Sequence, residues 1–382
     1  MSSDADARMQ RWQQSRAARL AQLPWLHVDS TGGRPIRYAK GEVLVSAEHE
    51  AVARQAMVAQ GIAADAITAD ATTLGYVRLS APGADVAATV AAVRAHGGDD
   101  AAGPNHVFVS TEGWEYGGPY GPPSTADAYQ LPTGPSATAS TRVTVVDTGI
   151  WRDSPLPKEW YDAAPADVAH STEEHADTGH ANFITGVILG RTDNARVRII
   201  KVLDANGVCR EHELAGALMS MEDTDVVNMS LGGFTDGDKP PVMLAKALAT
   251  MLHNKDRVVV AAAGNEGLDR PYWPAAFAGS EHSFADQIVA VAAHDGTQLC
   301  SWSNTGDWVS MAAPGSDIVS TYVTHDDFPS GFARWSGTSF AAPYVVGVIA
   351  HSHATAGSIR DAVANVRKQA TAAAYGGYPS LT

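Results

Sequence analysis

The sequence predicts an α/β protein with a mostly parallel central sheet, preceded by a small α+β module. The main observation is that, from Thr141 onward, strand-like stretches are continuous apolar runs that alternate with helical stretches. Such runs are typical of a parallel sheet that helices cover on both faces. The second observation is a compact alternation of short strand and helix patterns in residues 31–111. The chain of 382 residues, 45% of them hydrophobic, is long enough for two packed domains.

The small module is expected to span residues 31–111, after a polar, arginine-bearing arm at residues 1–30 that has a helical pattern from Ala5 to Leu23. Its expected elements are, in order, strand 41–46, helix 47–60, strands 66–70 and 74–80, helix 84–98 and strand 106–110. This order is that of a ferredoxin-like module. Ser46 is the expected cap of its first helix.

A stretch rich in Gly, Pro, Ser and Thr follows at residues 112–140 and has no apolar period. It is expected to be a linker with a candidate processing site, because proteolytic nicking concentrates in such exposed connections. The larger α/β domain is expected at residues 141–382. Its expected strands are 142–149, 197–204, 225–232, 257–265 and 288–293, and its helices include 213–221, 241–253 and 339–351.

Composition limits the classes of protein that the chain can belong to. The net charge of −15 argues against binding to nucleic acid or to an anionic membrane, because no basic surplus neutralises phosphates. The sequence has no run of 18 apolar residues, which is the length that would predict a transmembrane helix. Its N-terminus lacks the apolar part of a secretory signal. A cytoplasmic location is therefore expected, with non-classical export left open. Cys209 and Cys300 lack metal-type spacing and are expected to be free, buried thiols rather than a disulfide.

Four residues with the side chains of a nucleophilic site occupy the turns where strands end and helices begin. Asp147 ends a strand, His180 and Ser339 each begin a helix, and Asn265 follows an apolar strand in a tight turn. A serine hydroxyl needs a base within hydrogen-bond reach, and that base needs an acid to orient it. The amide of Asn265 and the backbone N–H of Ser339 could stabilise an oxyanion. The carboxyl ends of parallel strands meet at one edge, so these residues are expected to converge there.

The motifs around these residues resemble those of the subtilisin-like serine protease family, the subtilases. "SGTSFAAP" around Ser339 is the most specific match, and "VVDTGI" and "AAAGNEG" carry the aspartate and the asparagine. The resemblance covers residues 141–350 and implies a three-layer fold with a mostly parallel central sheet. It implies the roles of nucleophile, base and orienting acid for Ser339, His180 and Asp147, and an oxyanion role for Asn265. By the same resemblance, two segments bind the substrate backbone: Ser230, Leu231 and Gly232, and Ala262, Ala263 and Gly264.

The N-terminal module resembles the inhibitory propeptide of that family. The resemblance implies a serine endopeptidase, made as a self-inhibited proenzyme, that acts on a peptide or protein substrate, with its own N-terminal domain as intramolecular inhibitor. The junction is expected between Val107 and Ser140. A narrow intracellular role in maturing a peptide or protein fits the expected location. The alternative is a latent or inactive binding scaffold whose N-terminal module stays docked in the cleft.

Metals and substrate preference receive weaker signals. The stretch "HSTEEHADTGH" at residues 170–180 contains ligand-type side chains without the HExxH pattern, so no metal site is expected there. The chemistry requires no cofactor, and a structural calcium ion is left open without a supporting pattern. Glu266, beside the asparagine, could favour substrates with a basic residue before the scissile bond, and the charge of Arg270 could cancel that preference. The preferred interpretation is that both residues are solvated surface charges.

The histidine segment departs from the family pattern at three positions. Ala181 and Asn182 replace the usual glycine and threonine, and Thr185 replaces the usual alanine. Alanine favours the helix over glycine by about 1 kcal/mol, and none of the three changes removes a reacting atom. We therefore expect altered packing at the start of the helix, with His180 retained.

Overall fold

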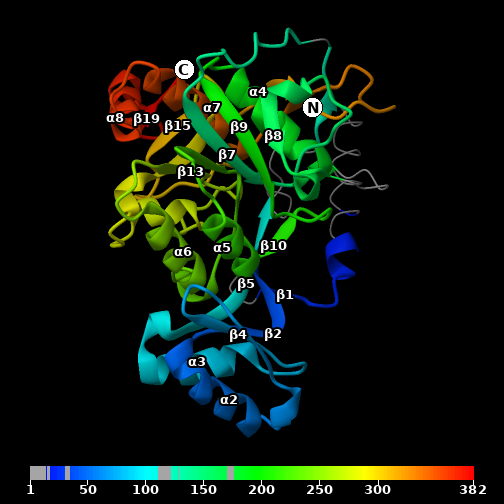
Figure 1. The fold of residues 1–382 in the computed structure, drawn as a ribbon, viewed down its shortest axis with the longest axis vertical. Helices are drawn as coiled ribbons and strands as arrows, with labels where there is room; N and C mark the ends of the chain where they lie inside the picture. The colour runs from blue at the N-terminus through cyan, green and yellow to red at the C-terminus, as the bar shows by residue number, and fades with distance from the viewer. Residues whose placement is uncertain (1–13, 15–17, 31–34, 111–121, 128, 170–175) are drawn as a thin grey trace.

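The computed structural model describes residues 14, 18–30, 35–110, 122–127, 129–169 and 176–382. A small part at one end holds residues 36 to about 106, and a larger part holds the C-terminal two thirds of the chain (Figure 1). One strand, β5, runs from the small part into the larger one.

The larger part is built on a nine-stranded sheet that is parallel except at the edge pair β18–β19. Its order is β18-β19-β15-β14-β13-β11-β7-β9-β8. The strands are β7 Thr141–Asp147, β8 Tyr161–Ala163, β9 Ala195–Lys201, β11 Val226–Met229, β13 Val258–Ala262, β14 Ile288–His294, β15 Met311–Pro314, β18 Thr371–Tyr375 and β19 Tyr378–Ser380. The prediction of a mostly parallel sheet made of continuous apolar strands is confirmed.

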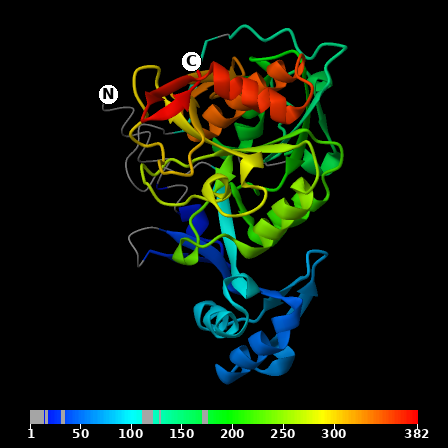
Figure 2. The same ribbon diagram turned by 90° about the vertical axis from the view of Figure 1, so that its left-hand side faces the viewer.

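Helices cover both faces of this sheet, which gives three layers (Figures 1 and 2). Alternate residues of each strand face opposite layers: Val145 packs in the core with one set of helices and Val146 in the core with the other. The first set is α4 His180–Leu189, α7 Thr338–His353 and α8 Ile359–Gln369, and the second is α5 Glu211–Met219 and α6 Val242–Leu252. Burial on both faces explains why β13 and β14 lack an alternating polar pattern.

The small part has the strand order β5-β2-β4-β3, with every pairing antiparallel and two helices packed on the sheet. Its elements are β2 Ile36–Ser46, α2 Glu50–Ala59, β3 Thr68–Ala71, β4 Tyr76–Ser80, α3 Val86–Gly97 and β5 Ala102–Ser110. The first helix starts later than expected, because residues 47–49 form a 3-10 turn. Ser46 makes no side-chain cap; its hydroxyl contacts His49 Nδ1 at 2.8 Å.

Strand β5 belongs to both parts of the molecule. Its first half pairs with β2, and its second half pairs antiparallel with β10 (Val208–Arg210) and β12 (Leu231–Gly232) of the larger part. The strand is buried along its whole length. In Figure 2 it is the cyan strand that rises from the small part into the body above it.

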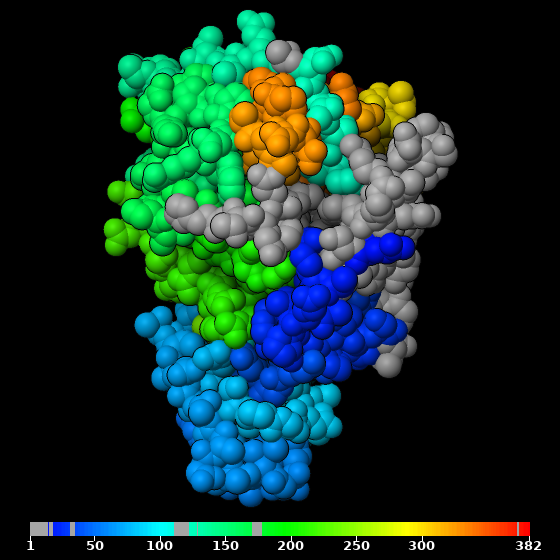
Figure 3. Space-filling view, turned by 90° about the vertical axis from the view of Figure 1, so that its right-hand side faces the viewer, coloured from blue at the N-terminus to red at the C-terminus, as the bar shows by residue number. Residues whose placement is uncertain are grey.

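The described arm and linker residues pack on these two parts. Residues 18–21 are helical, and β1 (Leu26–Asp29) pairs with β2. Leu20 and Leu26 are buried against Val107 and Val109 of β5, so this part of the arm contributes apolar contacts that its polar composition did not predict. Figure 3 shows the dark blue segment on the face where the two parts meet. In the linker, β6 (Ser124–Thr125) joins β16 (Ile318–Thr321) and β17 (Phe332–Trp335) in a small sheet.

Candidate active site

Asp147 and His180 meet at the carboxyl edge of the large sheet. His180 Nδ1 lies 2.8 Å from Oδ1 and 2.9 Å from Oδ2 of Asp147, and both side chains are buried. The backbone N–H of Thr148 also donates to Asp147 Oδ1, at 2.7 Å. A carboxylate only accepts hydrogen bonds, so this contact places the imidazole proton on Nδ1 and makes Nε2 the acceptor that a general base needs.

The segment around His180 is held by contacts that its unusual residues provide. Asn182 Nδ2 donates to the Trp151 carbonyl at 2.8 Å, and the Trp151 N–H donates to Asn182 Oδ1 at 2.9 Å. These two bonds tie the start of α4 to the loop that follows Asp147. The Thr185 hydroxyl donates to the Ala181 carbonyl at 2.8 Å. Asn182 is thus a positioning residue for the candidate site, which its polarity alone did not reveal.

Ser339 lies at the start of α7, beside Ser230. Its hydroxyl donates to the Ser230 carbonyl at 3.0 Å, and the Ser230 hydroxyl donates to the Ser339 carbonyl at 2.8 Å. The ring of Phe340, the next residue, lies 5.6 Å from the His180 ring. Within the described part of the chain, no hydrogen bond joins His180 to Ser339. The donor of Ser339 is engaged by Ser230, so the hydroxyl must turn before it can pass its proton to an imidazole, as is common in unliganded sites.

Asn265 is held by Thr338, the residue before Ser339. Asn265 Oδ1 accepts from the backbone N–H and from the hydroxyl of Thr338, each at 2.9 Å. The Thr338 hydroxyl accepts in turn from the N–H of Gly264 at 3.1 Å. With its carbonyl fixed in this way, the amide of Asn265 is directed away from Thr338. Thr338 is therefore a further positioning residue. The sequence did not predict this role, because nothing in "SGTS" indicates that the threonine contacts Asn265.

Asn304 organises the loop after Asn265. Asn304 Nδ2 donates to the Ala263 carbonyl at 3.0 Å and to Glu266 Oε2 at 2.7 Å, while its Oδ1 accepts from the N–H groups of Glu266 and Leu268. Glu266 Oε2 also accepts from the N–H of Asn265 at 2.9 Å. Glu266 is thus bound into the loop beside Asn265, which differs from a solvated surface charge.

Arg270 also differs from a solvated surface charge. Its guanidinium pairs with Asp238 and lies 5.5 Å from the centre of the Phe234 ring.

Of the two segments expected to bind substrate, one contacts Ser339 and the other leads to Asn265, and all six residues are buried. Leu231 and Gly232 pair antiparallel with Ser110 and Val109 of β5, and Ser230 contacts Ser339. Ala262 ends β13, and Ala263 and Gly264 lead to Asn265. Strand β5 therefore already pairs with part of the first of these two segments.

Both cysteines are free and buried, which confirms the expected thiols. Burial, together with nearby acidic side chains, holds the pKa of Cys209 well above its usual value and raises the pKa of Cys300 to about 12. Neither thiol is therefore ionised near neutral pH. Among the residues that the structure describes, no group of three or more His, Cys, Asp or Glu side chains is arranged to hold a metal ion. Most of the stretch at residues 170–180 lies outside the described residues. No described helix has the length and apolar character needed to cross a membrane.

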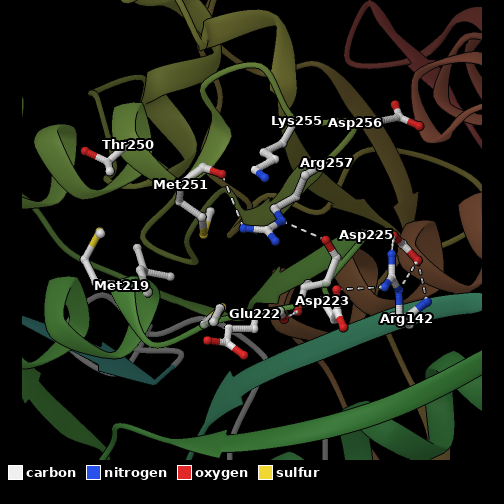
Figure 4. A pocket seen from close by; sticks show the side chains of 13 residues that line it. Arg142, Met219, Glu222, Asp223, Asp225, Thr250, Met251, Lys255, Asp256 and Arg257 are labelled. Carbon is white, nitrogen blue, oxygen red and sulfur yellow. Dashed lines mark hydrogen bonds and ion pairs between the residues drawn. The ribbon is translucent and has the colours of Figure 1, made fainter.

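A large cavity lies away from the candidate site. It has a volume of about 730 Å³ and is lined by Arg142, Asp225 and Arg257, which stand at the amino ends of β7, β11 and β13 (Figure 4). Arg142 Nη2 lies 2.6 Å from Asp225 Oδ1, and Arg257 Nε donates to the Thr224 carbonyl at 2.7 Å. Both arginine side chains of the cavity are bound by other groups of the cavity wall. The cavity also lies at the edge of the sheet opposite Asp147, so we do not place the reaction there.

The three-layer architecture and the site at its carboxyl edge define a subtilisin-like α/β protein. Among solved structures, a cold-adapted subtilisin-like serine proteinase matches with a TM-score of 0.50, over 65% of this chain and 89% of that chain. A lanthipeptide protease matches with a TM-score of 0.51, over 61% and 80%. Both are 22% identical to this chain, so they support the fold alone.

The subtilase family model, peptidase S8, matches residues 138–375, and the chain belongs to this family. A thermophilic serine proteinase of Bacillus sp. (strain AK1) is 32% identical over 265 residues, which are 65% of this chain and 61% of that protein. Thermitase of Thermoactinomyces vulgaris is 32% identical over 240 residues, which are 59% of this chain and 80% of thermitase. The chain thus covers less than two thirds of the length of the Bacillus relative.

Proposed function

We propose that the protein is a serine endopeptidase that is made in a self-inhibited form. The Ser339 oxygen attacks the carbonyl carbon of the scissile peptide bond while His180 Nε2 takes its proton. Asp147 holds the imidazole, and the Asn265 amide with the Ser339 N–H receives the charge that develops on the carbonyl oxygen. His180 then returns the proton to the leaving amine, and water releases the acyl group in a second, equivalent step.

The hydrogen bond between Asp147 and His180 is the observation that carries this proposal. It joins a strand end and a helix start that are 33 residues apart in sequence, at the edge where Ser339 and Asn265 also lie. Family membership adds support, because the matched relatives are named as serine proteinases. A buried aspartate that orients an imidazole is what the transfer of a serine proton requires.

Self-inhibition is supported by the position of β5. An extended peptide binds to an exposed sheet edge through main-chain hydrogen bonds, and β5 already makes such pairings with β10 and β12. Access of another peptide to these edges requires β5 to leave.

Polar contacts fix the N-terminal module in its docked position. His106 Nδ1 lies 3.0 Å from Glu211 Oε2, and both side chains are buried. Glu211 Oε1 also accepts from the N–H groups of Met243 and Leu244 at the start of α6. Nearby, Arg210 Nη1 lies 3.3 Å from Glu42 Oε1. Because Glu211 bonds to the module and to a helix terminus at once, it contributes to the docking and to the stability of the body.

Hydrolysis and self-processing can be tested on the purified full chain. We expect wild type to hydrolyse unfolded protein substrates and its 40.0 kDa mass to fall as the N-terminal module is removed. Ser339→Ala should keep its full mass and lack hydrolysis. Equal hydrolysis by both proteins would contradict the proposal, because contaminating proteases would then account for it.

A second candidate function is a latent or inactive binding scaffold. The burial of His180, Asn265 and Ser339, together with the insertion of β5, favours it. It predicts that wild type keeps its full mass indefinitely and hydrolyses nothing. The cytoplasmic location, a narrow role in peptide maturation and a structural calcium ion stay predictions, which cell fractionation, substrate profiling and unfolding with and without calcium would test.

A further inference from the structure

The register of β5 indicates where the residue before the scissile bond would sit. Val109 pairs with Gly232 and Ser110 pairs with Leu231. A substrate strand in the same register would carry its next residue opposite Ser230, whose carbonyl accepts from the Ser339 hydroxyl. That substrate residue, called P1, has its carbonyl carbon beside Ser339.

The side chain of P1 is bounded by two stretches of backbone. One is Ser230–Gly232, which pairs with the incoming strand, and the other is Ala262–Gly264, which leads to Asn265. We call the space between them the P1 slot. Each wall carries a glycine, Gly232 on one and Gly264 on the other.

The ring of Tyr272 already occupies the P1 slot. A methyl group placed on Gly232 would lie 2.2 Å from Tyr272 Cε1, and one placed on Gly264 would lie 3.0 Å from Tyr272 Cδ1. The methyl group on Gly264 would lie closer still to Asn304 Nδ2, at 2.2 Å, and to Glu266 Oε2, at 2.8 Å. The ring of Tyr272 therefore lies close to both glycines and directly beside Gly232. Only 3% of the surface of Tyr272 is exposed. Gly232 thus leaves room for the Tyr272 ring, and Gly264 leaves room for Asn304 with the same ring beside it.

Neighbouring contacts hold Tyr272 in the P1 slot. The backbones of Trp273 and Gly233 exchange two hydrogen bonds, of 2.9 and 3.0 Å, which fix the residue next to Tyr272 against the residue next to Gly232. The edge of the ring also packs on Phe234, with ring centres 5.2 Å apart. Moving the ring aside would break its contact with Phe234 and expose a large apolar surface, so the slot is not easily reopened.

We propose that Tyr272 is the specificity-determining residue of the proposed peptidase and that it restricts P1 to glycine, alanine or serine. This inference rests on the proposed function, since it concerns the same site. A leucine or phenylalanine side chain would have to share the slot with the ring, and overpacking of this kind is strongly unfavourable in close-packed surroundings.

The test is a series of peptides that differ only at P1, which carries Gly, Ala, Ser, Leu or Phe. They are assayed with protein that was purified as the full chain and has completed self-processing. We expect wild type to cleave the alanine peptide with a kcat/KM at least tenfold above that of the phenylalanine peptide. Tyr272→Gly should raise kcat/KM for the phenylalanine peptide at least tenfold. Tyr272→Phe keeps the ring and should keep the wild-type order of substrates.

Two controls separate specificity from folding and from the proposed function. Tyr161→Ala removes an aromatic side chain from β8, at the edge of the large sheet, and should not change the order of substrates. If Tyr272→Gly fails to fold, the order of kcat/KM values that wild type shows for the five peptides still tests the inference. A wild-type preference for phenylalanine or leucine at P1 overturns the inference and leaves the proposed function intact. Absence of any Ser339-dependent cleavage overturns the proposed function and this inference with it.

Discussion

The link between Thr338 and Asn265 gives a prediction that separates catalysis from stability. Thr338→Val removes the hydroxyl that donates to Asn265 Oδ1 at 2.9 Å and accepts from the Gly264 N–H at 3.1 Å. The backbone N–H of Thr338 still donates to Asn265 Oδ1. The substitution therefore halves the bonds that orient the amide and leaves one buried N–H without its partner.

The expected size of the effect follows from these contacts. Loss of a hydrogen bond costs about 1 kcal/mol, and a buried donor left unsatisfied costs about 1–3 kcal/mol. We therefore expect the free energy of unfolding to fall by about 2–4 kcal/mol. Removal of an oxyanion donor lowers kcat by about 10²–10³-fold. Because one orienting bond to Asn265 survives, Thr338→Val should lower kcat by only about tenfold, which corresponds to about 1.4 kcal/mol.

A double-mutant cycle with Asn265→Ala tests this reasoning. In that background Thr338→Val has no amide left to orient, so kcat should change less than about twofold. Thr144→Val is the matched control, because it removes a buried hydroxyl that contacts Thr224 and should lower stability without lowering kcat. An equal tenfold loss of kcat from Thr338→Val with and without Asn265 would refute the reasoning.

Three further changes test other parts of the structure. Asn182→Leu removes both hydrogen bonds to the Trp151 backbone, so the free energy of unfolding should fall by about 2 kcal/mol and kcat should drop a few-fold. An unchanged thermal unfolding curve would show that these two bonds do not stabilise the start of α4. Leu20→Ala weakens packing over Val109 and should speed conversion of the full-length mass, whereas an unaltered time course would show that the arm does not retain β5. Burial and the charge of a nearby arginine lower the pKa of His212, so the folded protein loses stability as the pH falls through the usual histidine value of 6.5. In His212→Gln the melting temperature should therefore depend less on pH between pH 7.5 and 5.5 than in wild type. Equal pH dependence of the two melting temperatures would show that His212 does not contribute to it.

Local patterns were sufficient to predict five of the nine strands of the large sheet. Apolar runs predicted β7, β9, β11, β13 and β14, because strands buried on both faces leave a continuous signal in sequence. Strand ends and helix starts also indicated where polar side chains could converge, and the structure brings Asp147 to His180. Boundaries were less accurate: the expected strand 225–232 divides into β11 and β12 at Ser230, which turns to contact Ser339.

Features that depend on distant partners could not be predicted in this way. The division of β5 between two sets of strands depends on β10 and β12, which lie about 100 residues further along the chain and carry no local mark of that pairing. Tyr272 is adjacent in sequence to residues without an expected role, and only the pairing of Trp273 with Gly233 places its ring beside Gly232. Similarly, Asn304 lies in a stretch without an assigned role until its four contacts with the 263–268 loop are seen.

The most direct test of the central claim is to find which residue reacts with a fluorophosphonate probe. Such a probe forms a bond only with a serine whose proton a neighbouring base removes. After processing, wild type should carry the label on Ser339, and peptide mapping by mass spectrometry would locate it. Ser339→Ala should stay unlabelled, and His180→Ala should label at least 100-fold more slowly. Label on a different residue, or equal labelling of wild type and His180→Ala, would contradict the account.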